Sequence, residues 1–249
     1  MQGQIIRVKG TFTNANLPKL TDLDTSSILK EILAHPACRS FYDFTDQSKL
    51  TLESGKIIKA TDLKSVGSFV ATSSELAPKF VTTALNGTGG AFFDRNEGML
   101  RNFFSGATNQ TVDVGCQVLS LTGTQILLCE SDLSQNNLYY NGSQISIAGG
   151  SKRINWSGEQ RLKINRVTGV YTANLAPKIL LNGVAGDITG TTFHKAPDGD
   201  ATLGRNLLAS DANYANIYIG HVAVFDADVS NDSYLNNLLK EYHLRKYKI

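Results

Sequence analysis

The chain has 249 residues, of which 18% are charged, and a formal net charge of +2. That length allows one large β domain or two small domains. The near-neutral balance excludes a broad electrostatic attraction to nucleic acid or to an anionic membrane, so neither is an expected partner.

The first 37 residues are predicted to form an arm and a short helix, separate from the domain 38–249 that follows. In "QIIRVKGTFTN" the alternating residues Ile6, Val8 and Phe12 share one face, which indicates a half-buried strand. Capping residues, an apolar stripe at helical spacing and then Pro36 predict a helix that ends before this proline. The opening segment lacks an apolar core long enough for a signal peptide, and no run approaches a membrane span. We therefore expect folding in a reducing cytosol, without membrane insertion.

From Phe41 onward the chain is predicted to be all-β. Short apolar runs alternate with Gly, Asn, Asp and Ser, and three Asn-Gly pairs predict tight hairpins. These pairs are Asn86-Gly87, Asn141-Gly142 and Asn182-Gly183. Many short strands at close spacing favour a sandwich or jelly roll, and the lack of strand–helix alternation argues against a parallel α/β sheet.

The run "NIYIGHVAVF" predicts a strand that is covered on both faces, because both of its faces are largely apolar. The expected faces are Ile217, Ile219 and Phe225 on one side, and Tyr218, Val222 and Val224 on the other.

The closing stretch predicts an amphipathic helix. "DADVSND" supplies turn and N-cap residues, and Leu235, Leu238, Leu239 and Tyr242 follow at helical spacing. We expect this helix to lie on the domain that precedes it.

Three segments resemble the concanavalin A-like, or laminin G-like, jelly rolls found in many bacterial and phage proteins. They are "IGHVAVFDADVSNDSYLNNLLKEYHLRKY", "FYDFTDQSKLTLESGKIIKATDLKSVG", and "KILLNGVAGDITG" followed by "DATLGRN", which together span roughly residues 41–249. The family usually has tryptophans in its opening segment, where this chain has Phe41, Tyr42 and Ala60. The resemblance implies an all-β, concanavalin A-like jelly-roll sandwich, with no implied specific ligand.

The sequence contains no recognised catalytic motif. Superfamily members that hydrolyse glycans resemble one another in a Glu-x-Asp-x-Glu strand, whose alternation places the acids on one face. Here Glu130, Asp132 and Ser134 occupy those positions, so the third acid is missing. A solvated strand end is the favoured interpretation, and we expect no enzyme activity.

The sequence offers few candidate metal ligands. The three cysteines are odd in number and widely spaced, and the four histidines lack metal-ligand spacing. His221 is interpreted as a hydrogen-bonded core histidine. Laminin G-like domains often hold calcium, and Asp198 and Asp200 offer oxygen ligands suited to it, with a simple turn as the alternative. No other cofactor is expected.

The first functional hypothesis is a non-enzymatic structural or attachment protein of a tailed-phage virion, in its tail, baseplate or capsid decoration. Such a protein would be assembled in the host cytoplasm with other virion proteins, as a homo-oligomer. The arm would add a strand to a neighbouring sheet edge, with Ile6, Val8 and Phe12 as anchors.

The second hypothesis is a lectin-like module that binds host surface glycans. Trp156, Tyr139 and Tyr140 are candidate aromatic platforms for a sugar, with core or rim packing as the alternative. A glycan hydrolase ranks third.

Overall fold

The computed structural model describes residues 25–65, 67–95, 97–120, 123–130, 138–141, 144–147, 152–155, 162–186, 198–205 and 215–249. Within them the chain is an all-β sandwich with two α-helices, which confirms the predicted fold class. The predicted arm, with Ile6, Val8 and Phe12, lies outside the described residues. No helix of the described part combines the length and apolar character needed to cross a membrane.

The helices are α1 (Thr25–Ala34) and α2 (Ser233–Lys246), with short 3-10 helices η2 (Gln47–Lys49) and η4 (Val229–Asn231). The strands are β1 (Cys38–Asp43), β2 (Leu50–Glu53), β3 (Lys56–Thr61), β4 (Ser68–Ala71), β5 (Lys79–Leu85), β6 (Thr88–Arg95), β7 (Met99–Ser105), β8 (Asn109–Val118), β9 (Thr124–Glu130), β10 (Leu138–Asn141), β11 (Gln144–Ile147), β12 (Lys152–Asn155), β13 (Ile164–Thr172), β14 (Lys178–Leu181), β15 (Val184–Ala185), β16 (Asp198–Leu203) and β17 (Ala215–Phe225).

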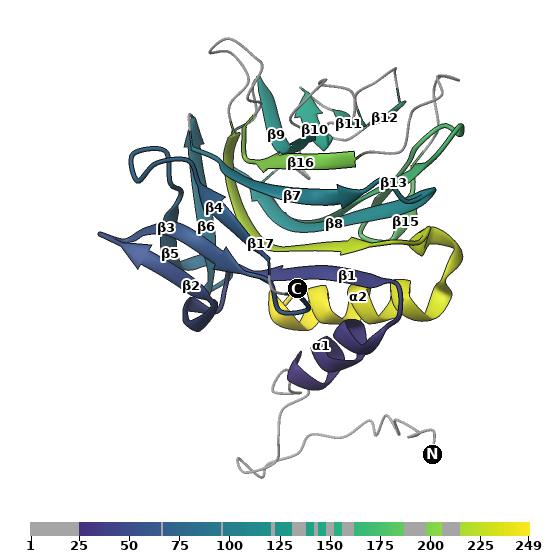
Figure 1. Ribbon diagram of the computed structural model, residues 1–249, viewed down its shortest axis with the longest axis horizontal. Coiled ribbons are helices and arrows are strands. Elements are labelled where there is room, and N and C mark those ends of the chain that lie inside the picture. The colour runs from purple at the N-terminus through teal and green to yellow at the C-terminus, as the bar shows by residue number, and fades with distance from the viewer. Residues whose placement is uncertain are drawn as a thin grey trace.

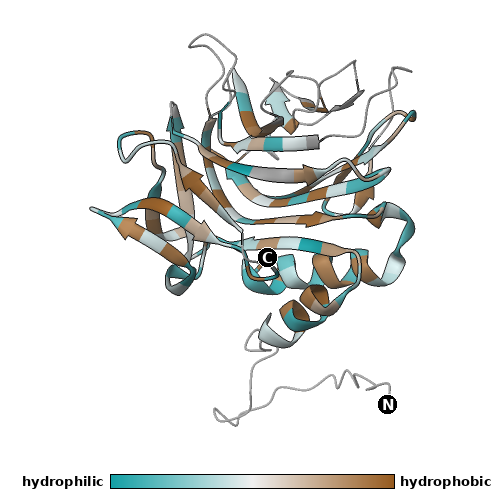
Figure 2. Ribbon diagram, viewed as in Figure 1, coloured by the Kyte–Doolittle hydropathy of each residue, from teal (hydrophilic) through white to brown (hydrophobic). Residues whose placement is uncertain are grey.

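The sandwich has two antiparallel layers joined at one side. In the first layer, β17 pairs with β8, β8 with β13, and β13 with β14, while β1 and β6 share the other edge of β17. In the second layer, β7 pairs with β4 and β16, and β9 continues from β16 to β10. Apolar residues of both layers form one large core, and Figure 2 shows apolar residues along the central strands.

Both helices cover the other face of the first layer. They lie together on the side of β1 (Figure 1), and a second apolar cluster joins them to β1 and β17. In that cluster Ile32 of α1 and Leu239 of α2 are buried with Phe41 of β1. Asp232 caps α2, because its carboxylate accepts a hydrogen bond from Leu235 N at 3.0 Å. The two predicted helices are confirmed, and α1 shares its core with α2.

Strand β17 is buried on both faces from Ile219 to Phe225, whereas Asn216 and Tyr218 near its start are half-buried, and a β-bulge changes which residues share a face. Its pairing with β8 shifts register between Ile219 and His221. The alternation therefore restarts after the bulge, so Phe225 faces the helices while Val224 stays in the sandwich core. The expected grouping of Phe225 with Ile217 and Ile219 is wrong for this reason.

Two of the predicted Asn-Gly hairpins are confirmed. Asn86 joins β5 to β6 and Asn182 joins β14 to β15, with φ values of 51° and 50°. The glycines that follow them also have positive φ, as a two-residue type I′ turn requires. The third pair begins at Asn141, the last residue of β10, and its Gly142 lies outside the described residues.

Candidate functional site

The predicted aromatic platform does not form one surface. Tyr139 is half-buried on β10, whereas Tyr140 is fully buried and its hydroxyl lies 3.8 Å from Cys116 Sγ. Consecutive strand residues point to opposite faces. The structure therefore places Tyr140 in the core, where a ligand cannot reach it, and leaves Tyr139 as a candidate contact. Trp156 lies outside the described residues.

The predicted calcium ligands lie near one end of a strand. Asp198 and Asp200 are the first and third residues of β16. In the part of the chain that the structure describes, no three His, Cys, Asp or Glu side chains are grouped to hold a metal ion. The calcium site stays a prediction. Glu130 ends β9, and Asp132 with Ser134 lies outside the described residues.

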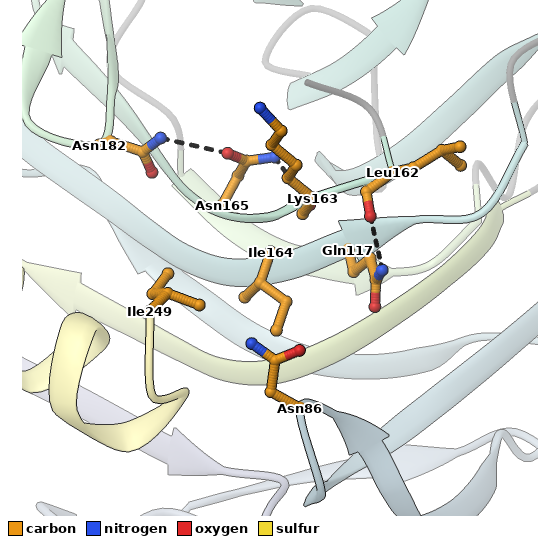
Figure 3. Close-up of a pocket in the computed structure, with 8 residues that line it drawn as sticks. All are labelled: Asn86, Gln117, Leu162, Lys163, Ile164, Asn165, Asn182 and Ile249. Carbon is orange, nitrogen blue, oxygen red and sulfur yellow. Dashed lines mark hydrogen bonds between the residues drawn. The ribbon is translucent and has the colours of Figure 1, made fainter. Parts of the chain in front are cut away.

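A groove of about 390 Å³ opens where the first layer meets the end of α2 (Figure 3). We call it the amide groove, because carboxamide side chains make up half of its lining. Its lining residues are Asn86, Gln117, Leu162, Lys163, Ile164, Asn165, Asn182 and Ile249. The two hairpin asparagines, the start of β13 and Ile249, three residues beyond α2, thus meet here from distant parts of the sequence.

The register of the paired strands determines which residues form the floor of the groove. Gln117 of β8 is directly opposite Ile164 of β13 on one side and Tyr218 of β17 on the other. Directly opposite residues share a face, so the half-buried Tyr218 continues this floor across the sheet. Its ring packs 5.2 Å from that of Phe92, which is opposite it on β6. A strip of partly exposed aromatic surface therefore adjoins the amide groove.

Hydrogen bonds hold the carboxamides in place. Gln117 Nε2 donates to Leu162 O at 2.6 Å, and Asn86 Nδ2 donates to Tyr247 O at 3.1 Å. Asn182 Nδ2 donates to the side chain of Asn165 at 3.1 Å. Among the described residues, Gln117 Oε1 and Asn86 Oδ1 accept no hydrogen bond, which leaves them available to a ligand.

A buried polar network lies between the first layer and α2. Asp113 accepts hydrogen bonds from Arg166 Nε and Thr168 Oγ1, both at 2.6 Å, and its other oxygen lies 3.2 Å from His221 Nε2. His221 Nδ1 lies 2.8 Å from the Tyr247 hydroxyl. Burial opposes ionisation of Asp113, but the Arg166 charge and the bonds from His221 and Thr168 hold its pKa well below the usual range. The prediction of a hydrogen-bonded core histidine at position 221 is confirmed.

The sequence alone did not indicate that the groove is a site. Asn86 and Asn182 were predicted only as turn residues, and no role was predicted for Gln117 or Lys163. The usable signal was that two Asn-Gly turns carry exposed carboxamides, but their meeting at one end of the first layer depends on strand order.

No protein-family model matches the chain, and no curated protein matches it. Among solved structures, a Trypanosoma rangeli sialidase in complex with sialic acid has a TM-score of 0.62 at 12% identity, covering 87% of this chain and 38% of that chain. Domain 4 of AbnA, a GH43 extracellular arabinanase from Geobacillus stearothermophilus, in complex with arabinotriose, has a TM-score of 0.54 at 13% identity, covering 81% of this chain and 98% of that chain. The botulinum neurotoxin serotype G binding domain has a TM-score of 0.54 at 12% identity, covering 80% of this chain and 50% of that chain.

The matched fraction of each solved chain differs. This chain spans well under half of the sialidase, at 38%, but is similar to nearly the whole of the arabinanase domain, at 98%. At these identities the likeness concerns the fold alone. The solved structures therefore agree with the described strands that this chain is an all-β sandwich.

Proposed function

We propose that this chain is a non-enzymatic carbohydrate-binding module that takes a saccharide in the amide groove. The observation that carries the proposal is the lining of that groove, which combines four carboxamides with aliphatic side chains. Sugar hydroxyls both donate and accept hydrogen bonds, and so do carboxamides. The aliphatic side chains and Tyr218 offer apolar surface to the C–H faces of a sugar ring. A volume of about 390 Å³ lies within the usual range of small-molecule sites.

Two comparisons support this class. The arabinanase domain, solved with arabinotriose, is matched over 98% of its length, and the neurotoxin structure is a binding domain. Both have the sandwich fold without sequence similarity that would transfer a ligand.

The carboxylates near the groove support a binding role over hydrolysis. Glycosidases place two carboxyl groups on either side of the bond that they cleave. Of the described residues that line the amide groove, none is acidic. Asp113 belongs to the buried polar network between the first layer and α2. Both of its oxygens form hydrogen bonds there, with Arg166, Thr168 and His221.

The narrower proposal is that the module belongs to a tailed-phage particle, together with other virion proteins. It rests on the sequence resemblance and on the arm of residues 1–24, which the structure does not describe. Deletion of these residues should abolish assembly into the particle, and assembly that survives the deletion would remove the arm from the proposal.

Glycine substitutions at the two turns test the saccharide site. Asn86→Gly and Asn182→Gly remove a carboxamide while keeping a residue that tolerates positive φ. Asn174→Gly is the matched control, because Asn174 also has positive φ, at 62°, is exposed, and follows the far end of β13.

A glycan array first identifies a saccharide, and calorimetry then compares the variants. Each groove variant should bind about tenfold more weakly, while the Asn174 variant binds as the wild type does. If Tyr139→Ala or Trp156→Ala abolishes binding and the groove variants do not, the saccharide site is elsewhere.

A further inference from the structure

A second, smaller cavity of about 180 Å³ adjoins the amide groove. We call it the basic pocket. Its lining residues are Arg166, Asn182, Lys240, His243, Leu244 and Ile249. Asn182 and Ile249 also line the amide groove, so the two spaces meet at these residues.

Two residues that line this pocket carry buried polar atoms without partners. The side chain of Arg166 is 1% exposed, and two of its nitrogens are satisfied, Nε by Asp113 and Nη1 by Asn236. Its Nη2 has no hydrogen-bond partner among the described residues. The same holds for both ring nitrogens of His243, which is 2% exposed. Buried polar atoms are nearly always hydrogen-bonded, so such a concentration beside a cavity points to a missing partner.

The charge around the two spaces is positive. Lys240 is exposed on α2 and Lys163 lies on the rim of the amide groove, and neither forms an ion pair with a described residue. No acidic side chain of the described residues lines either space. A carboxylate only accepts hydrogen bonds, and guanidinium, ammonium and amide N–H groups are its usual donors.

We propose that the saccharide in the amide groove is an acidic sugar, whose carboxylate enters the basic pocket beside Arg166 and Lys240. This inference rests on the proposed function, since the groove must hold the rest of the sugar. Asn182 lines both spaces, so it contacts both the sugar ring and the carboxylate of the ligand. His243 contributes the single N–H of a neutral imidazole as a further donor.

The test compares acidic polysaccharides with the same polysaccharides after their carboxylates are reduced to primary alcohols. The two ligands differ only in the group that the basic pocket would hold. Calorimetry on the full chain at low salt should show a preference of about tenfold for the acidic form, and this preference should shrink as salt increases.

Three variants connect the preference to the pocket. Lys240→Ala removes an exposed charge, and Arg166→Lys keeps a cation opposite Asp113 while it removes Nη2. Both should bring the preference for the acidic polysaccharide over its reduced form close to unity. Lys59→Ala, at an exposed position of β3, is the matched control and should keep the preference. If Arg166→Lys does not fold, Lys240→Ala still tests whether the basic pocket produces the preference.

The outcomes separate the two proposals. Equal binding of the acidic and reduced polysaccharides would overturn the acidic-sugar inference and leave the saccharide site standing. Acetate that binds as tightly as the acidic polysaccharide would also overturn it, because the sugar would then contribute nothing. Failure of both polysaccharides and of the whole glycan array to bind would overturn the proposed function and the inference with it.

Discussion

The imidazole of His243 provides a quantitative test of the buried polar layer under α2. Neither of its ring nitrogens has a hydrogen-bond partner among the described residues. Burial, together with the nearby His221, lowers the pKa of His243 to about 3. In an unfolded chain a histidine has a pKa of about 6.5. We therefore expect His243→Leu to change how the stability of the protein depends on pH.

The sign and size of the effect follow from proton binding. Between the two pKa values the unfolded chain binds one more proton at position 243 than the folded protein does, so the free energy of unfolding decreases as the pH falls. The slope is about 1.4 kcal/mol per pH unit, and the full window corresponds to roughly 4–5 kcal/mol. The leucine variant lacks this contribution. At neutral pH it should be at least as stable as the wild type, because it removes unpaired polar atoms from the interior.

Urea unfolding of both proteins at a series of pH values from about 7 to 4 measures the difference. Glu97, whose pKa burial raises, and Asp113 titrate in both proteins and cancel in the comparison. A stability difference that stays constant across this range would refute a neutral, buried imidazole at position 243.

Two further substitutions test the elements that support the groove. Asp113→Asn leaves the buried Arg166 without its ion-pair partner and should lower the free energy of unfolding by about 3–5 kcal/mol in urea titrations, whereas a loss below about 1 kcal/mol would mean that the network is replaceable. Asp232→Ala removes the N-cap of α2 and should cost about 1 kcal/mol, measured as a lower thermal midpoint, and an unchanged midpoint would show that the cap is dispensable.

Local sequence signals predicted the elements of the fold well. The leucine spacing in residues 235–239 marked α2, and the Asn-Gly pairs marked two hairpins, because each depends on neighbours within a few residues. The bulge in β17 was not predictable, since it depends on how β17 pairs with β8. It moved Phe225 to the helix-facing side although the hydrophobic pattern itself was correctly identified.

The candidate site could not be predicted in the same way. Gln117 and Ile164 are 47 residues apart and become neighbours only through the register of β8 and β13. The orientation of adjacent residues was equally hard to predict. Tyr139 and Tyr140 are the same residue type, so the sequence does not indicate which of them faces the core. Non-local pairing therefore limits what this sequence reveals about binding.

Side-chain amide NMR signals report directly on whether the amide groove holds a saccharide. On addition of a saccharide identified on the array, the carboxamide signals of Asn86, Gln117 and Asn182 should shift, while that of Asn174 should stay in place. Shifts confined to residues around Tyr139 on β10, with the groove carboxamides unchanged, would mean that the saccharide does not bind in the amide groove.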